Sequence, residues 1–349
     1  MNRGAEVSLL AKWLPSVNAS CRETVRTAKK IARAVNMTDA EYRRTLSSLR
    51  RYIRIIENNL RERDYSFEYE MQPSKALIKY RQAFIRNDGD RYRAFLCNAA
   101  RNPYVMNTAA LTPYDIVRPV LGSEKMSKEE RRSLDVTWNA LENYVNSDNS
   151  LVVVDGSGSM YCGDGSVTPA AVAQSLGVYF AERNKGMFRN HFITFSRHPR
   201  LVEIKGSDIY EKIRYCMSFN ECSNTDIANT FDLILATAVK NHMRQKDMPS
   251  RIIIISDMEF DWCADNSDMT NFESAKERFA KCGYRLPKLV FWNVNSHGRQ
   301  QPVTMNEQGV VLVSGMSPQI FAMLRNDRMD PYGFMMEVVS AKRYETIAT

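Results

Sequence analysis

The amino-acid sequence predicts an α/β protein in which an α-helical region precedes a doubly wound, mostly parallel, Rossmann-like sheet. Two observations carry this prediction. From residue 151 onward, short apolar runs rich in β-branched residues alternate with helical segments, and such alternation is typical of a parallel sheet covered by helices. Before that point the chain shows helix-capping patterns and helical periodicity. We therefore expect a basic helical region over residues 1–147 and an α/β domain over residues 148–349.

The helices of the first region are predicted from capping boxes and apolar spacing. Thr38 with Glu41, and Ser127 with Glu130, have the spacing of a capping box that begins a helix. After Thr38 the apolar residues recur every three or four positions as far as Leu60, which predicts one continuous helix with an apolar face. The proline-rich residues 101–120 are expected to be irregular. Further helices are expected at Arg22–Val35, Ser74–Ile85, Asp90–Ala99 and 128–146.

The second region alternates strands and helices in a regular order. Strands are expected at Leu151–Val154, His191–Phe195, Leu201–Ile204, Ile252–Ile255, Leu289–Val294 and Val310–Val313. Helices are expected at Thr168–Asn184, Ser207–Met217, Asp226–His242, Asn271–Lys281 and Pro318–Asn326. About 180 residues are enough for one core of this kind.

The composition is that of a folded protein, with 44% apolar and 25% charged residues. Its seven cysteines are scattered and lack a Cys-x-x-Cys pair, which favours reduced thiols over disulfides or a zinc site. No apolar run approaches the roughly 18 residues that span a bilayer, and the first residues lack a signal-peptide core. We therefore expect a cytoplasmic protein with no membrane partner.

The positive charge is concentrated in the first part of the chain. Residues 1–150 hold 26 Lys and Arg against 18 Asp and Glu, whereas the remainder holds 22 of each. Five arginines crowd the polar face of the helix expected after Thr38: Arg43, Arg44, Arg50, Arg51 and Arg54. Such a surface suits a polyanion such as RNA, whose phosphate contacts make binding salt-dependent. It equally suits a solvated helix face that binds nothing.

The first strand of the α/β domain runs into a loop rich in glycine and serine. Gly158 and Gly163 have the glycine spacing of a phosphate-binding loop, but Asp164 stands where that loop needs lysine and would repel phosphate. Tyr161 replaces the third glycine of a dinucleotide-binding loop. The serines lack the flanking glycines of a nucleophile elbow. Phosphate, dinucleotide and acyl chemistry are therefore not indicated.

Oxygen-bearing side chains remain as candidate ligands of a hard cation. Asp155, Ser157 and Ser159 alternate along an extended turn, so that their side chains point the same way. Asp257 follows another apolar strand, and Thr225 precedes the helix expected at residue 226. Mg²⁺ and Mn²⁺ prefer such oxygen ligands. Because no general base or nucleophile accompanies them, binding is favoured over catalysis. The alternative is that these residues only cap strand-to-helix turns.

In order and spacing, these five residues resemble the metal-ion-dependent adhesion site of the von Willebrand factor A (VWA) domain. The resemblance implies that Asp155, Ser157, Ser159, Thr225 and Asp257 hold Mg²⁺ or Mn²⁺, directly or through water, and that a partner protein supplies a carboxylate. Four further acids could approach the ion from outside these ligands: Asp164, Asp226, Glu259 and Asp261. Glu259 and Asp261 could equally face solvent.

A wider resemblance covers nearly the whole chain. Segments such as PSKALIKYRQAFIRND at 73–88 and GYRLPKLVFWNVN at 283–295 resemble the uncharacterised family called domain of unknown function 2828. That family is similar to the Ro ribonucleoproteins, in which a helical RNA-binding ring precedes a VWA domain. The first expectation is therefore a non-enzymatic binding or scaffold protein that uses the metal to bind an acidic partner. The second is a ribonucleoprotein component. The third is a metal-dependent phosphohydrolase or nuclease using Asp155, Asp257 and Asp261.

Overall fold

A computed structural model of the chain describes residues 10–53, 55–145, 149–162, 168–221, 226–257, 267–294, 310–315, 320 and 331–341. The chain forms two compact units, Met1–Gln72 with Arg86–Asp88, and Pro73–Ile85 with Gly89–Thr349. The second unit thus includes helices that precede the sheet in the sequence. The domain boundary expected between residues 147 and 148 is based on a change in sequence character, whereas these two units are defined by their compactness. That boundary therefore stays a prediction.

The first unit contains four α-helices within its described residues: α1 (Leu10–Trp13), α2 (Arg22–Ala34), α3 (Asp39–Tyr52) and α4 (Ile56–Glu62). The capping box at the start of α3 is confirmed. The Thr38 hydroxyl accepts from the Glu41 N–H at 3.2 Å, and the Glu41 carboxylate accepts from the Thr38 N–H at 2.8 Å. Ala28, Ala32, Tyr42 and Leu46 form a small buried core between α2 and α3.

The prediction of a single long helix in this unit is wrong, because the chain leaves the helical conformation at Ile53. That residue is extended, with ψ near 132°, and α4 begins only at Ile56. The Asn58 side-chain amide donates to the carbonyl oxygens of Arg50 and Ile53, both at 2.8 Å. A side chain therefore satisfies carbonyls that a continuing helix would have satisfied. Ile53 and Ile56 are both buried, which is why their spacing looked helical.

The second unit opens with α5 (Ser74–Asn87), α6 (Gly89–Arg101), α7 (Pro113–Leu121) and α8 (Lys128–Ala140). Helix α8 follows the expected Ser127 capping box but ends before residue 146. Helix α7 overturns the expectation that residues 101–120 are irregular. Thr112 and Asp115 form a capping box, and Pro113 takes the first helical position, where no N–H is required. Proline alone was therefore a poor guide to irregular structure here.

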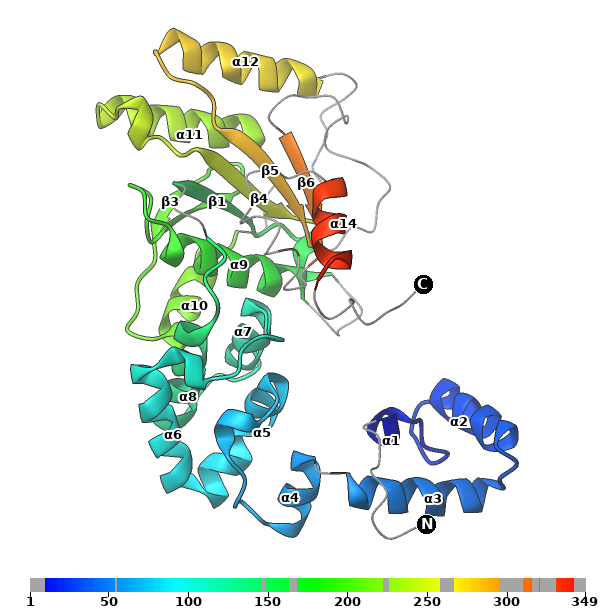
Figure 1. Cartoon of the computed structure of the whole chain (residues 1–349). Helices are drawn as coiled ribbons and strands as arrows, with labels where there is room; N and C mark the ends of the chain where they lie inside the picture. The colour runs from blue at the N-terminus through cyan, green and yellow to red at the C-terminus, as the bar shows by residue number, and fades with distance from the viewer. Residues whose placement is uncertain are drawn as a thin grey trace. The chain divides into compact units, whose positions relative to one another are not determined.

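The residues that the structure describes include six strands: β1 (Ser150–Asp155), β2 (His191–Phe195), β3 (Leu201–Glu203), β4 (Arg251–Ser256), β5 (Lys288–Asn293) and β6 (Val310–Ser314). They form one sheet in the order β3-β2-β1-β4-β5-β6 (Figure 1). Every pairing is parallel except that of β3 with β2. The link between β2 and β3 is too short for a crossover, and an antiparallel pair follows. The α/β class with a mostly parallel sheet is confirmed.

Helices cover both faces of this sheet (Figure 1). Val152 and Val154 of β1 pack into a core shared with α9 (Pro169–Arg183) and α10 (Ile209–Met217). Leu151 and Val153 face the other core, beneath α11 (Ile227–Lys240) and α12 (Ser267–Lys281). Burial on both faces explains the uninterrupted apolar run of β1. A last helix, α14 (Pro331–Val339), was not expected. The helix expected at Pro318–Asn326 lies almost wholly outside the described residues.

Helices α7 and α8 belong to the core of the sheet although they precede it in the sequence. Ile116, Val117 and Val120 of α7, with Leu134 and Trp138 of α8, are fully buried in the same cluster as α9. Within the described residues, no helix combines the length and the apolar character needed to cross a bilayer.

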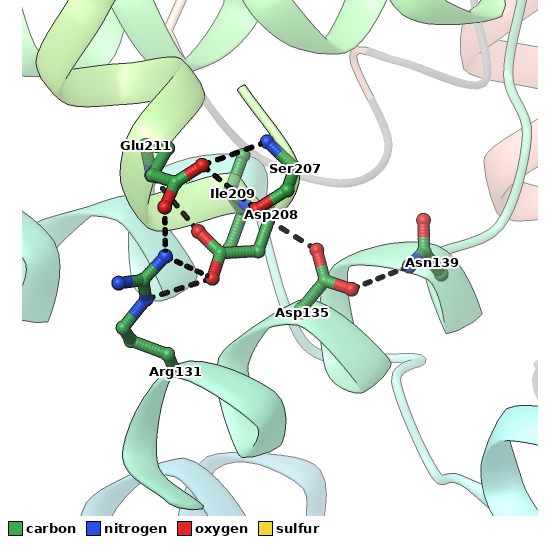
Figure 2. Close-up of polar contacts among 7 residues, drawn as sticks. All are labelled: Arg131, Asp135, Asn139, Ser207, Asp208, Ile209 and Glu211. Atoms are coloured by element: carbon green, nitrogen blue, oxygen red, sulfur yellow. Dashed lines mark hydrogen bonds and ion pairs between the residues drawn. The ribbon is translucent and has the colours of Figure 1, made fainter. Parts of the chain in front are cut away.

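A network of charged side chains fixes α8 to α10 (Figure 2). The Arg131 guanidinium contacts Asp208 at 2.6 Å and Glu211 at 2.5 Å. Asp208 also caps α10 by accepting from the Glu211 N–H at 2.9 Å. Asp135 accepts from the Ile209 N–H at 3.0 Å. Two carboxylates thus satisfy N–H groups of the first turn of α10, and one arginine links that turn to α8.

Candidate metal centre

Two acids lie together at the carboxyl-terminal edge of the sheet. Asp155 is the last residue of β1, and Asp257 directly follows β4. These strands are neighbours, and Val154 pairs with Ile255. Asp155 is 0% exposed and Asp257 is 2% exposed. Ligands of doubly wound sheets bind at this edge, beyond the ends of the strands.

Both oxygens of the Asp155 carboxylate accept hydrogen bonds. The Ser157 N–H donates to Oδ1 at 2.8 Å, and the Ser256 hydroxyl donates to Oδ2 at 2.5 Å. Ser256 was not among the expected site residues. The signal was present in the sequence, because β1 and β4 are equal apolar runs and one ends in aspartate where the other ends in serine. These bonds fix the orientation of the Asp155 side chain.

The electrostatic environment of Asp155 favours a cation. Burial raises the pKa of Asp155 to about 6, the Ser256 and Ser157 hydrogen bonds oppose that rise, and the nearby Asp257 adds to it. No Lys or Arg of the described residues forms an ion pair with Asp155. A divalent cation beside the two carboxylates would offset both the burial and the mutual repulsion.

The loop after β1 brings two hydroxyls to the same edge. The Oγ atoms of Ser157 and Ser159 are 3.1 Å apart, and both side chains are half-buried. Gly156 lets the loop pass close to Asn220, since a Cβ at that position would lie 3.3 Å from the Asn220 Cα. Asn220 in turn donates to the Tyr161 hydroxyl at 2.7 Å. The loop is therefore held against the segment that follows α10.

Of the remaining expected site residues, the structure describes only Asp226. Thr225, Asp164, Glu259 and Asp261 lie outside the described residues, and their roles stay predictions. Asp226 begins α11 as its N-cap and accepts from the backbone N–H groups of residues 228 and 229 at 2.9 and 3.1 Å. These bonds stabilise the first turn of α11. A second role of Asp226 near a metal ion stays a prediction.

The donor set suits a hard divalent cation, because every candidate atom is a carboxylate or hydroxyl oxygen. In the part of the chain that the structure describes, no three His, Cys, Asp or Glu side chains gather as a metal site would require. A cation here would therefore depend on Ser157 and Ser159, and on oxygen ligands beyond Asp155 and Asp257.

The arginines of α3 divide into two groups. Arg43, Arg44 and Arg51 are exposed. Arg50 instead donates to the carbonyl oxygens of Ala11 at 3.1 Å and Leu14 at 2.6 Å, and so fixes α1 against α3. Arg54 lies outside the described residues. Of the four described members of the expected polyanion surface, three are thus exposed cations.

Comparison with known proteins gives distant relatives. An uncharacterized protein of Acanthamoeba polyphaga mimivirus is 26% identical over 354 residues, which cover 95% of this chain and 60% of that protein. The chain therefore spans less than two thirds of that relative. The crystal structure of the Ro (RSR) protein of Deinococcus radiodurans matches at 14% identity over 92% of this chain and 74% of that one, with a TM-score of 0.47. The SpRpn10 VWA domain matches at 16% identity over 53% and 96%, with a TM-score of 0.33.

Family models divide the chain into two adjoining parts. Residues 1–151 match domain of unknown function DUF2828, the family that the sequence resembles. The match does not extend over the α/β part, where a different model takes over at residue 149. Through residues 149–342, which hold the whole sheet and the candidate metal centre, the chain belongs to the family of domain of unknown function DUF7788.

Proposed function

We propose that the protein is a non-enzymatic binding protein that captures an acidic group of a partner protein through a divalent cation. Asp155, Ser157, Ser159 and Asp257 would hold Mg²⁺ or Mn²⁺, with Thr225 as a further ligand. One observation carries the proposal: two buried carboxylates end adjacent parallel strands, and a pair of hydroxyls 3.1 Å apart follows the first of them.

The chemistry of these donors explains why a partner would bind. Hydroxyls are neutral ligands, and only two carboxylates would compensate the charge of the ion. A bound cation would keep its affinity for a further anionic oxygen. The chain itself supplies the fixed Asp155 carboxylate and the half-buried hydroxyls, which leave one side of the site accessible. No nucleophile or general base with a suitable contact is found among the described residues around these ligands, which favours binding over catalysis.

Affinity purification from cells in MgCl₂ and in EDTA tests this function. A Ser157→Ala, Ser159→Ala double variant removes two ligands and no buried charge, so the fold is kept. We expect partners that the wild type retains in Mg²⁺ and releases in EDTA to be absent from the double variant. The matched control is Ser123→Ala with Ser218→Ala, whose hydroxyls each donate only to a nearby backbone carbonyl at the surface. If the same proteins bind in EDTA or to the Ser157 and Ser159 variant, the proposal is wrong.

RNA binding by α3 is the alternative function, supported by the exposed Arg43, Arg44 and Arg51, which form no ion pair within the described residues. Filter binding to single-stranded RNA should then weaken steeply with salt. Arg43→Glu with Arg51→Glu should reduce affinity, whereas Arg189→Glu with Lys240→Glu, an equal charge change elsewhere, should not. Binding that ignores both salt and the α3 variant would exclude this function.

A further inference from the structure

The second unit contains a small pocket between α6 and α8 that is separate from the candidate metal centre. This α6–α8 pocket has a volume of about 130 Å³, and its floor is apolar, formed by Ile85, Tyr92 and Leu96. Tyr92 and Leu96 are 3% and 1% exposed. The Tyr92 hydroxyl shares a 2.7 Å hydrogen bond with the Ser133 hydroxyl of α8, and its ring stacks on Phe95. The floor is therefore rigid before any ligand arrives.

Charged side chains surround the opening of the α6–α8 pocket. Arg93, Lys128, Arg132 and Glu129 line it, and all four are exposed. Three cations thus face one acid. An apolar floor beneath a cationic rim favours a ligand that combines an apolar group with negative charge.

The rim cations are incompletely neutralised by the protein itself. Arg93 pairs with Asp90 at 2.5 Å, but the Asp90 side chain is 96% exposed, so water screens this pair. Arg132 donates to the Cys97 sulfur at 3.0 Å, and a thiol is a weak acceptor. Lys128 forms no ion pair with any residue in the described ranges. An anionic ligand could therefore bind here without displacing a buried salt bridge.

We propose that the α6–α8 pocket is a docking site for a partner-protein segment in which one leucine or phenylalanine is flanked by aspartate or glutamate. An apolar cavity of about 150 Å³ can hold benzene, so the volume suits one such side chain. Burial of that side chain would strengthen binding by roughly ten- to hundredfold. The rim cations would attract the flanking acids and orient the segment. This interaction needs no metal and is independent of the function proposed above.

A nucleic-acid strand fits these features less well. Nucleotide bases bind proteins by stacking on accessible aromatic faces, whereas Tyr92, the aromatic residue of this pocket, is buried. Ile85 and Leu96 offer no hydrogen-bonding group to a base edge. The apolar floor therefore favours a protein side chain as the occupant, and charge complementarity favours acidic neighbours.

Fluorescence polarisation of the full chain in EDTA tests the proposal. The probe is a labelled peptide, Asp-Glu-Asp-Leu-Asp-Glu-Asp, compared with the same peptide carrying a central Ala. Lys128→Glu with Arg132→Glu reverses the rim charge, and Arg101→Glu with Lys125→Glu makes the same change outside the pocket. Gly89→Met extends a side chain from the pocket wall, where an added Cβ would meet only the flexible Arg93 guanidinium at 3.4 Å.

We expect the leucine peptide to bind at least about tenfold more tightly than the alanine peptide. Gly89→Met should abolish this difference, and the reversed rim should weaken the binding of both peptides, while Arg101→Glu with Lys125→Glu changes neither. Equal binding of the two peptides would overturn the proposal, as would equal losses in the rim and control variants. Tighter binding of single-stranded RNA than of the peptide, lost in the reversed rim but kept in Gly89→Met, would also overturn it in favour of an electrostatic nucleic-acid surface.

Discussion

The Ser256 hydroxyl donates a hydrogen bond to the Asp155 carboxylate between the two central strands of the sheet, with Oγ and Oδ2 2.5 Å apart. Together with the Ser157 N–H on the other oxygen, this bond orients a buried carboxylate at the site where a cation is proposed. Loss of a group that orients a metal ligand in this way typically costs about 10- to 100-fold in metal affinity.

Replacement of Ser256 by alanine should therefore destabilise the protein. The buried Asp155 carboxylate would lose a donor that lowers its pKa, and a lost hydrogen bond to a charged group costs about 1.5–3 kcal/mol. Urea unfolding at pH 7 measures the change. Ser218→Ala, at an exposed position, should change stability by less than about 0.5 kcal/mol. Equal effects of the two variants would show that the Ser256 bond contributes nothing specific.

The link between α8 and α10 should depend on pH through Glu211. Hydrogen bonds from the Ser207 N–H and hydroxyl, followed by that from Arg131, lower the pKa of Glu211 to about 2 from an ordinary value of 4.5. Because the folded pKa is lowered, ionised Glu211 contributes stability above pH 4.5, and the contribution is lost as the pH falls toward 2. Glu211→Gln should therefore be less stable than wild type at pH 7, and the difference should shrink between pH 4.5 and 2.

Unfolding midpoints of wild type and Glu211→Gln across that pH range measure this effect. Glu203→Gln, at an exposed strand position, is the matched control and should show no such trend. A constant difference between wild type and Glu211→Gln at every pH would contradict the role given to the ionised carboxylate.

Gln174 of α9 should be replaceable with a gain in stability. Its side chain is 0% exposed, and neither its nitrogen nor its oxygen has a hydrogen-bond partner among the described residues. A buried amide without partners costs about 1–3 kcal/mol, so Gln174→Met, of similar shape, should raise the melting temperature. Gln174→Glu, which buries a charge, should lower it. A loss of stability in Gln174→Met would instead indicate an ordered water on the amide.

Arg50 and Arg43 should behave differently although both lie on α3. Arg50 donates to two carbonyl oxygens of the α1 segment, whereas Arg43 is exposed. Arg50→Ala should accelerate proteolytic cleavage near residues 10–14, because the segment loses two charge-assisted bonds. Arg43→Ala should leave the cleavage rate unchanged. Comparable rates in the two variants would show that Arg50 is not a structural anchor.

The sequence predicted the strands well because strands that are buried on both faces of a sheet appear as uninterrupted apolar runs. The apolar runs at Leu151–Val154 and Ile252–Ile255 correctly predicted β1 and β4. The capping boxes at Thr38 and Ser127 correctly predicted where α3 and α8 begin. The break at Ile53 was missed because apolar spacing continues through it, although the nearby Asn58 side chain donates to the carbonyl oxygens of Arg50 and Ile53 at the broken end. Helix α7 was missed because the prolines outweighed the Thr112 capping box.

The residues of the candidate metal centre could also be predicted only in part from the sequence. Asp155 and Asp257 were found because each follows an apolar run, and parallel strands bring such ends together. Ser256 ends an apolar run as long as the one that ends in Asp155, but the strand register was needed to place its hydroxyl against that carboxylate. The structural use of Arg50 required knowledge of where the α1 carbonyls lie. Features of local composition were thus accessible, and features that depend on contacts across the fold were not.

Calorimetric titration of the full chain with MgCl₂ tests the central claim most directly, with Asp155→Ala beside Asp232→Asn, a change at an exposed carboxylate. We expect saturable binding of one Mg²⁺ to wild type and to Asp232→Asn, and none to Asp155→Ala. The same titration with MnCl₂ should give the same pattern. Wild type that binds neither ion, or an Asp155→Ala variant that binds them as tightly as wild type, would contradict a metal centre at the end of β1.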